Sequence, residues 1–240
     1  TGTKYIEQSP AMTITSNLLD QQKTIQRDKR RVLVASCVCY SRCIDMFEVL
    51  LGKDVRYLPR HSENTDSMLE KNSSPPAALS LLRQRLGDAC NEIGKILLDE
   101  MRFVLNREPT RLTDDGIHVV ADILLFSAEF WFTEGLTTFN ICNDSRNIAL
   151  LRCNLCQCSK IRANSTFAKP KSNSDASSHA EVCLQCGAEH LQKAHEALCQ
   201  RDIDPITWDM VSQELAATFL VLGVRRRQGL LGGGTTPVIM

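Results

Sequence analysis

Apolar residues recur three and four positions apart along most of this chain, and the longest such pattern runs from Ala77 to Asn106. This spacing places side chains on one face of an α-helix. The pattern stops before Pro109, because a proline disfavours helical backbone in the residue that precedes it. The expected buried face consists of Leu79, Leu82, Leu86, Cys90, Ile93, Leu97, Met101 and Val104.

The same periodicity predicts five more helices and a weaker one over 10–26. Three of them begin at capping signals, which are Thr113-Asp114-Asp115, a capping box from Ser178 to Glu181, and Asp204-Pro205. Another helix is expected to start at Asn143-Asp144. The apolar positions of the five helices, one set per helix in chain order, are Val32, Ala35, Cys39, Cys43, Met46 and Leu50; Ile117, Ala121, Leu124, Ala128, Trp131 and Gly135; Leu150, Leu151, Leu155 and Ile161; Ala180, Cys183, Gly187, Leu191, Ala194 and Leu198; Trp208, Val211, Leu215, Phe219 and Leu222. No convincing run alternates apolar and polar residues, so the predicted fold class is all-α.

Changes in composition divide the predicted helices into regions. Residues 1–27 form an N-terminal flanking segment that is partly helical, and 28–228 form the helical domain. Polar residues over 60–74 and 164–177 predict flexible insertions. The last helix is expected to end at Arg225-Arg226-Arg227, and 229–240 form a glycine-rich tail or linker.

A spacing of small residues indicates how these helices pack. Leu86-Gly87, Cys90 and Gly94 resemble the first helix of a tetratricopeptide repeat (TPR), and the spacing is echoed by Ala128, Trp131 and Gly135. Glycine inside a helix costs about 1 kcal/mol relative to alanine, so it persists where another backbone comes close. We therefore predict antiparallel helical hairpins stacked as a TPR-like α-solenoid, although the echo lies farther away than the usual unit of about 34 residues. The expected helix-packing residues are Gly87, Gly94, Gly135, Trp131 and Ala194.

Charge and composition favour a protein that binds other proteins inside the cell. The 28 basic and 28 acidic side chains leave a formal net charge of zero, which lacks the basic excess of nucleic-acid-binding modules. No apolar run approaches the roughly 18 residues of a membrane span. Eleven cysteines without a secretory signal fit a reducing compartment.

The cysteines raise the alternative of a zinc site. Cys183-x-x-Cys186 lies near His190 and His195, but on a straight helix His195 points about 140° away from His190. A composite site that adds Cys153 and Cys156 is conceivable. Core packing is the favoured interpretation, because free cysteine behaves as a small hydrophobic residue.

No arrangement of residues predicts catalysis. Cys90, Cys142 and Cys199 lie in or beside helical stripes and have no base to activate them. Gly232-Gly233-Gly234 lacks the lysine of a phosphate-binding loop. We therefore expect no enzyme, cofactor, metal or small-molecule substrate.

Two segments, 149–162 (ALLRCNLCQCSKIR) and 190–198 (HLQKAHEAL), resemble the erythroid differentiation-related factor family. The resemblance implies a fragment of a large intracellular protein with TPR-like repeats, linked to transcriptional control of globin expression and located in the nucleus. The expected function is thus a non-enzymatic protein-protein interaction scaffold. The alternative is a zinc-binding or nucleic-acid-binding transcription module.

Overall fold

The structure is a computed structural model that describes residues 10–51, 77–105, 114–165 and 173–232. Within these ranges the chain forms six α-helices and no strand, so the all-α prediction is confirmed. The helices are α1 (Pro10–Leu50), α2 (Ala77–Leu105), α3 (Asp114–Cys142), α4 (Ser145–Ser165), α5 (Asn173–Leu198) and α6 (Pro205–Gly232).

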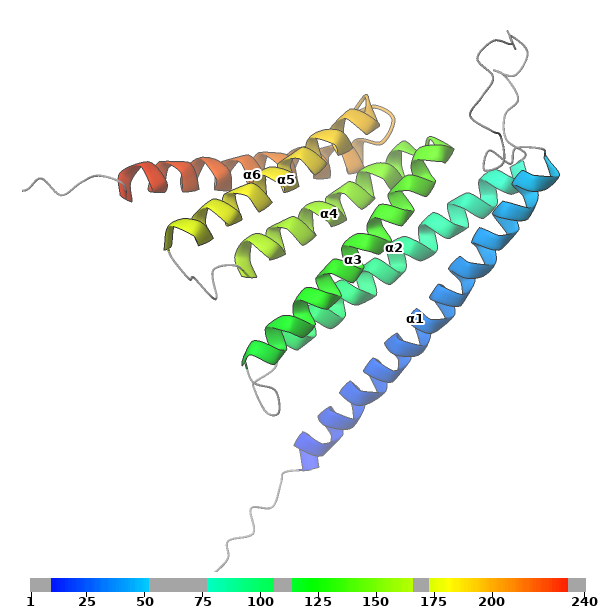
Figure 1. Cartoon of the computed structure of the whole chain (residues 1–240), viewed down its shortest axis with the longest axis horizontal. Helices are drawn as coiled ribbons and strands as arrows, with labels where there is room; N and C mark the ends of the chain where they lie inside the picture. Colours follow the sequence, from blue (N-terminus) through cyan, green and yellow to red (C-terminus); the bar gives the residue numbers. More distant parts are fainter. Residues whose placement is uncertain (1–9, 52–76, 106–113, 166–172, 233–240) are drawn as a thin grey trace, which may run out of the picture.

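The helices follow one another side by side as antiparallel hairpins (Figure 1). The most extensive pairings are α2 with α3 and α4 with α5, and α3 packs on α4 to join the two hairpins. Helix α1 packs on α2, while α6 packs on α5 and also touches α4. This is the stacked-hairpin arrangement that the sequence predicts.

Local sequence explains the sharp connections after α3 and α5. Asn143 and Cys199 adopt positive φ angles of 55°, which terminates each helix. Asp144 then caps α4, because its Oδ1 accepts a hydrogen bond from the backbone N–H of Asn147 at 3.1 Å. Asp204 caps α6 in the same way through Thr207, at 3.1 Å. The cap at Asp204 was predicted from the sequence, as was the start of a helix at Asn143-Asp144.

The first helix differs from the prediction in extent and in orientation. It is continuous from Pro10 to Leu50, so the expected break near 27 is wrong; no glycine or proline interrupts 11–50. Among the α1 side chains that the structure describes, the buried apolar ones are Cys37 and Ile44, whereas the predicted face is exposed at Val32 (65%) and Met46 (65%). The helix carries apolar residues on more than one side, and contact with α2 selects the side of Cys37.

Two helix ends also differ from the prediction. Helix α4 reaches Ser165 and α5 begins at Asn173, so the predicted insertion over 164–177 is too long and the capping box at Ser178 lies inside a helix. Helix α6 continues past Arg227 to Gly232. No proline lies within 171–177 or 228–232, so the two helices can extend through these segments. The insertion predicted over 60–74 lies outside the described residues.

One apolar residue of α6 was also assigned to the wrong face. Phe219 is 43% exposed, and Thr218 is fully buried instead. The Thr218 hydroxyl donates a hydrogen bond to the Glu214 carbonyl at 2.7 Å, which lets this polar side chain be buried without losing a partner.

Helix α3 is unusually apolar for its position. By length and composition alone, Gly116–Cys142 could cross a membrane, and 22% of its apolar window is buried in the fold. This differs from the expectation that no stretch is apolar enough, because a few polar residues interrupt the run but leave its mean hydropathy high. Its predicted inner stripe is confirmed at Ala121, Ala128 and Gly135, which are all buried.

Candidate functional site

The glycines of α2 lie where two phenylalanine rings of α3 cross the helix. A Cβ atom added to Gly87 would lie 2.6 Å from Cε2 of Phe139, and one added to Gly94 would lie 2.7 Å from Cδ1 of Phe132. These separations are shorter than carbon–carbon contact. Gly87 and Gly94 are seven residues apart, and so are Phe132 and Phe139. Because the helices run antiparallel, the same contact forms twice, with the earlier glycine under the later ring.

Gly135 lies at the junction of three helices. A Cβ atom at this position on α3 would lie 3.2 Å from Cβ of Cys90 and 3.3 Å from the carbonyl oxygen of Gly87, both on α2. It would also lie 3.1 Å from Cδ1 of Leu151 on α4. Because α3 pairs with α2, the echo at Gly135 marks the second helix of the same hairpin and not the first helix of the next repeat.

The other two residues expected to pack helices lie at different depths. Trp131 is half-buried beside the core of α2, α3 and α4, and its ring meets Phe130 edge-on with centroids 5.5 Å apart. Ala194 of α5 is fully buried with Cys153, Leu191 and other residues in a cluster between α4, α5 and α6. The structure therefore places Gly87, Gly94, Gly135 and Trp131 around one core and Ala194 in the next.

Polar side chains connect α2, α4 and α6 across the hairpins. Asn154 Nδ2 donates a hydrogen bond to Asn91 Oδ1 at 2.9 Å, and Arg102 Nη2 donates one to Gln157 Oε1 at 3.3 Å. Lys160 Nζ lies 2.5 Å from Glu214 Oε1. We call this set the α2–α4–α6 row; its residues are Asn91, Arg102, Asn154, Gln157, Lys160 and Glu214.

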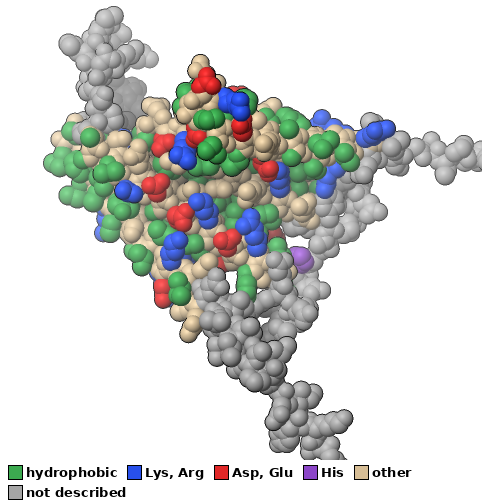
Figure 2. Space-filling view, turned by 180° about the vertical axis from the view of Figure 1, so that it is seen from behind, with side chains coloured by type: hydrophobic (Ala, Val, Ile, Leu, Met, Phe, Trp, Pro, Cys, Tyr) green, Lys and Arg blue, Asp and Glu red, His purple; other side chains and the backbone are tan. Residues whose placement is uncertain are grey.

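The face seen from behind carries charges of both signs. In Figure 1, α3 lies in front of α2, so the reverse view in Figure 2 looks onto the side of α2 that α3 leaves open. Basic and acidic side chains are interspersed over this face (Figure 2). Such a mixed surface suits hydrogen bonds and short ion pairs to a protein segment better than a phosphate backbone.

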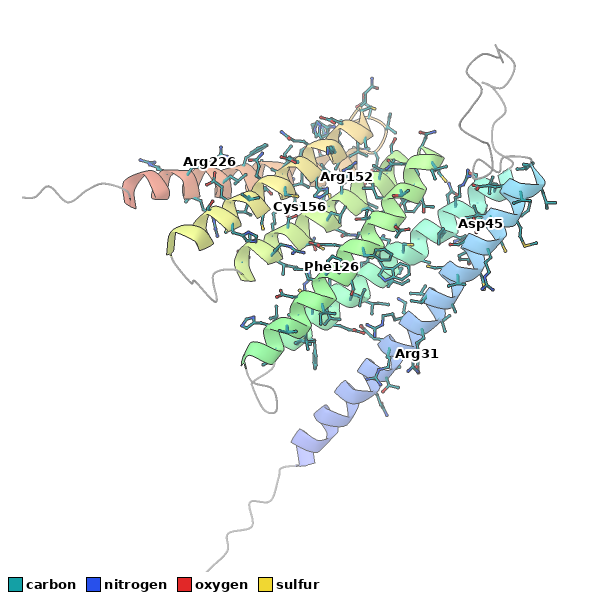
Figure 3. All side chains as sticks on the ribbon, in the orientation of Figure 1. Arg31, Asp45, Phe126, Arg152, Cys156 and Arg226 are labelled. Atoms are coloured by element: carbon teal, nitrogen blue, oxygen red, sulfur yellow. The ribbon has the colours of Figure 1, made fainter. Side chains whose placement is uncertain are left out.

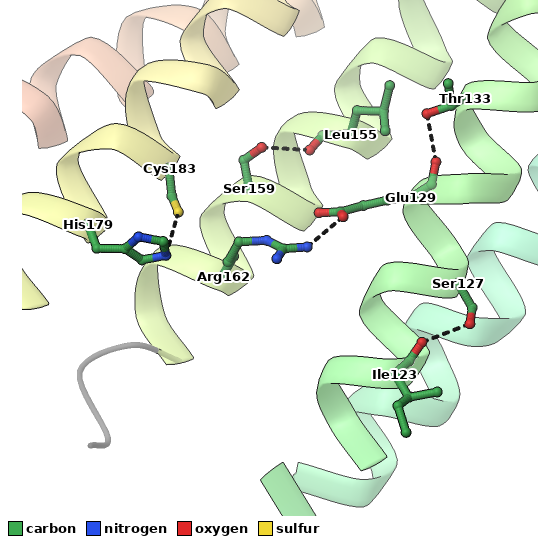
Figure 4. Close-up of polar contacts among 9 residues, drawn as sticks. All are labelled: Ile123, Ser127, Glu129, Thr133, Leu155, Ser159, Arg162, His179 and Cys183. Atoms are coloured by element: carbon green, nitrogen blue, oxygen red, sulfur yellow. Dashed lines mark hydrogen bonds and ion pairs between the residues drawn. The ribbon is translucent and has the colours of Figure 1, made fainter. Parts of the chain in front are cut away.

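Ion pairs also connect neighbouring helices along the array. Arg162 of α4 reaches Glu129 of α3 at 2.5 Å (Figure 4). Arg83 of α2 reaches Glu48 of α1 at 2.6 Å, and Arg226 of α6 reaches Glu181 of α5 at 2.6 Å. Arg30 and Glu100 form another pair between α1 and α2.

The cysteines that suggested zinc are dispersed through the packing. Burial raises the pKa of Cys153 to about 12 and that of Cys156 to about 11. Cys183 contacts His179 at 3.5 Å (Figure 4), while the His195 ring lies against Trp208, with centroids 4.7 Å apart. Among the described residues, no group of three or more His, Cys, Asp or Glu side chains is placed to hold a metal ion.

A half-buried cation lies beside a half-buried histidine between α4 and α5. Arg152 Nε and His190 Nδ1 are both buried and lack a hydrogen-bond partner among the described residues. Burial and the positive charge of Arg152 lower the pKa of His190, as Lys193 also does, whereas Glu189 raises it. The position of Arg152 is marked in Figure 3.

Comparison with known proteins agrees with this architecture. The family model described as erythroid differentiation-related factor 1-like, TPR repeats, matches residues 82–226, which extend from α2 into α6. The chain belongs to this family. The predicted resemblance and the TPR-like solenoid are therefore confirmed.

Proteins named erythroid differentiation-related factor 1 from Mus musculus, Homo sapiens and Pongo abelii are 23%, 24% and 25% identical to this family member over 199 residues. The matched region is 82% of this chain but only 14% of the mouse and human proteins and 15% of the Pongo abelii protein. The chain thus corresponds to a small part of these relatives. No solved structure matches it.

Sequence reasoning missed both the aromatic partners of the glycines and the α2–α4–α6 row. Phe132 and Phe139 share the seven-residue spacing of Gly87 and Gly94, and this signal was available in the sequence. The pairing of Asn91 with Asn154 had no such signal, because it depends on how two hairpins stack.

Proposed function

We propose that this region is a non-enzymatic scaffold that holds a segment of a partner protein against the α2–α4–α6 row. The family supports a helical repeat protein of the kind that mediates protein interactions. The α2–α4–α6 row is the proposed binding face, because it crosses from one hairpin to the next and its polar groups come from three helices.

The observation that carries the proposal is that each pair of the row joins polar side chains of two different helices. Asn91 and Arg102 of α2 face Asn154 and Gln157 of α4, and Lys160 of α4 faces Glu214 of α6. Each pair has donors or acceptors that a bound segment can share or replace. The glycine contacts hold α2 against α3, so α2 is fixed in place before a partner arrives.

We also propose that the chain acts inside the cell, in the nucleus, as part of a regulator of transcription during erythroid differentiation and globin expression. The names of the three relatives support the link to erythroid differentiation. Eleven free cysteines support a reducing compartment. Imaging a fluorescent fusion of the full-length family protein tests the location, and exclusion from the nucleus would contradict it.

Site-specific photo-cross-linking tests the binding face. A photoreactive phenylalanine derivative is placed at Gln157, an exposed residue of the row, and in a control chain at Val182, which is 63% exposed on α5. Each chain is irradiated in nuclear extract. We expect a discrete cross-linked protein at Gln157 that excess unlabelled chain removes, and none of that species at Val182. Equal cross-linking at both positions, or none at Gln157, would refute the proposed face.

A further inference from the structure

Helix α3 carries a second apolar stripe that faces solvent. Val119, Ile123, Phe126 and Phe130 are 58%, 60%, 69% and 51% exposed. Their spacing of four, three and four residues places them on a single face of the helix. Figure 3 marks Phe126 on α3. We call these four residues the α3 stripe.

The polar residues within and beyond the stripe leave it effectively apolar. The hydroxyls of Ser127 and Thr133 donate hydrogen bonds to the carbonyls of Ile123 and Glu129 at 2.8 Å each (Figure 4). Thr137 does the same toward Thr133 at 3.0 Å. Beyond Thr137 the same face reaches Ile141, which is 54% exposed, so the surface extends for about 30 Å along the helix.

The position of α3 in the array makes this exposure informative. Helices at the end of a solenoid expose apolar faces that a further repeat would cover. That explanation suits α6, which exposes Ile206 and Leu220. It does not suit α3, because α2 and α4 already pack on it from the preceding and following positions in the chain. The α3 stripe is therefore left open by neighbours that are both present.

The charged side chains that α3 itself places beside the stripe are all acidic. Helix α3 contains aspartate and glutamate residues and no lysine or arginine. The exposed Asp122 and Glu134 lie on opposite sides of the stripe, about 60° from its centre at 100° per residue. Glu129 lies on the side of Asp122, where Arg162 pairs with it. An apolar ridge with acidic flanks is complementary to a helix with an apolar face and basic flanks.

We propose that the α3 stripe binds an amphipathic helix whose flanks are basic, contributed by a partner protein. The inference rests on the proposed function only in that the chain is a scaffold, since it uses a different surface from the α2–α4–α6 row. Phe126 and Phe130 are the anchoring side chains, and Asp122 and Glu134 select the charge of the partner.

The same charges disfavour the two other occupants of such a surface. A second copy of the chain would bring acidic flanks against acidic flanks. Helices that lie in a membrane interface carry lysine and arginine on their polar side and approach anionic lipid, which the acidic flanks of α3 would repel. Both occupants are outcomes of the experiment below.

The test measures binding of two synthetic helical peptides of about 20 residues to the 240-residue chain by fluorescence anisotropy. Both have the same leucine and alanine face, and the polar face is lysine in one and glutamate in the other. We expect the lysine peptide to bind at least about tenfold more tightly than the glutamate peptide. We expect Phe126→Asp to lower the affinity of the chain for the lysine peptide by at least about tenfold. The matched control Phe219→Asp, on the exposed side of α6, should change the affinity by less than about twofold.

The double variant Asp122→Lys/Glu134→Lys should reverse the preference between the two peptides. Circular dichroism spectra check that each variant retains its helices. The proposal is overturned by absence of lysine-peptide binding, by equal affinity for both peptides, or by binding that Phe126→Asp leaves intact. Flotation with phosphatidylcholine vesicles or self-association that Phe126→Asp abolishes would instead assign the stripe to lipid or to a second copy. Because none of these variants touches Gln157, cross-linking there reports separately on the α2–α4–α6 row.

Discussion

The ring of Phe132 occupies the space in which a side chain at Gly94 would lie. Its Cδ1 atom is 2.7 Å from the position of a Cβ atom on that glycine. One helical heptad away, Phe139 covers Gly87 in the same manner. Two contacts between a phenylalanine ring and a glycine therefore hold α2 and α3 in register. The positions of the α2–α4–α6 row and of the α3 stripe depend on this pairing.

The two aromatic faces of α3 should respond very differently to truncation. Phe132 is fully buried against Gly94, so Phe132→Ala should lower the free energy of unfolding by about 3–5 kcal/mol. Phe126 is 69% exposed on the same helix, and Phe126→Ala should change it by less than about 0.5 kcal/mol. Urea unfolding followed by circular dichroism measures both. Similar losses for the two variants would mean that α3 is rotated from the orientation described.

Acidification should destabilise the fold through His190. Burial and Arg152 lower the pKa of this histidine from its ordinary value of 6.5. The folded chain therefore binds its proton less readily than the unfolded chain, and the stabilisation present above pH 6.5 is lost as the pH falls from there toward the folded-state pKa. His190→Gln should make the free energy of unfolding less dependent on pH between about 7.5 and 5.5. If the variant and the wild type show the same slope, the environment of His190 is not as described.

Thiol reactivity should separate the cysteines into two classes. Cys39, Cys43, Cys186 and Cys199 are exposed, whereas Cys153, Cys156 and Cys158 are buried. Burial raises the pKa of Cys153 and Cys158 to about 12, so their reactive thiolate form is scarce near neutral pH. An aromatic disulfide reagent should label the exposed group rapidly in the native chain and the buried group only after urea is added. Mass spectrometry of peptides identifies each site, and rapid native labelling of Cys156 would contradict the packing of α4 on α5.

The periodicity of the sequence predicts most of the helices because their neighbours accept the same face that the pattern presents. In α5 every predicted stripe residue is buried, including Cys183 and Leu198. The short caps at Asp144 and Asp204 are local, so they too can be read from the sequence.

Prediction fails where a helix offers more than one apolar face. In α1 the contact with α2 buries Cys37 and leaves Val32, which lies on the predicted face, exposed. Periodicity alone ranks these faces equally, since the choice depends on a partner helix distant in sequence. The same reasoning applies to the pairing of Asn91 with Asn154 between two hairpins.

Both proposed surfaces depend on the close approach of helices at Gly94, and a matched pair of alanine variants tests this most directly. Gly94→Ala forces a methyl group into the Phe132 ring and should lower the free energy of unfolding by about 1–3 kcal/mol. Gly223→Ala on α6 meets nothing within 4 Å and should raise it by up to about 1 kcal/mol, because alanine favours helix over glycine. Urea denaturation of both variants is predicted to give shifts of opposite sign. A Gly94→Ala chain as stable as the wild type, or stabilised like Gly223→Ala, would contradict the packing on which both proposed surfaces rest.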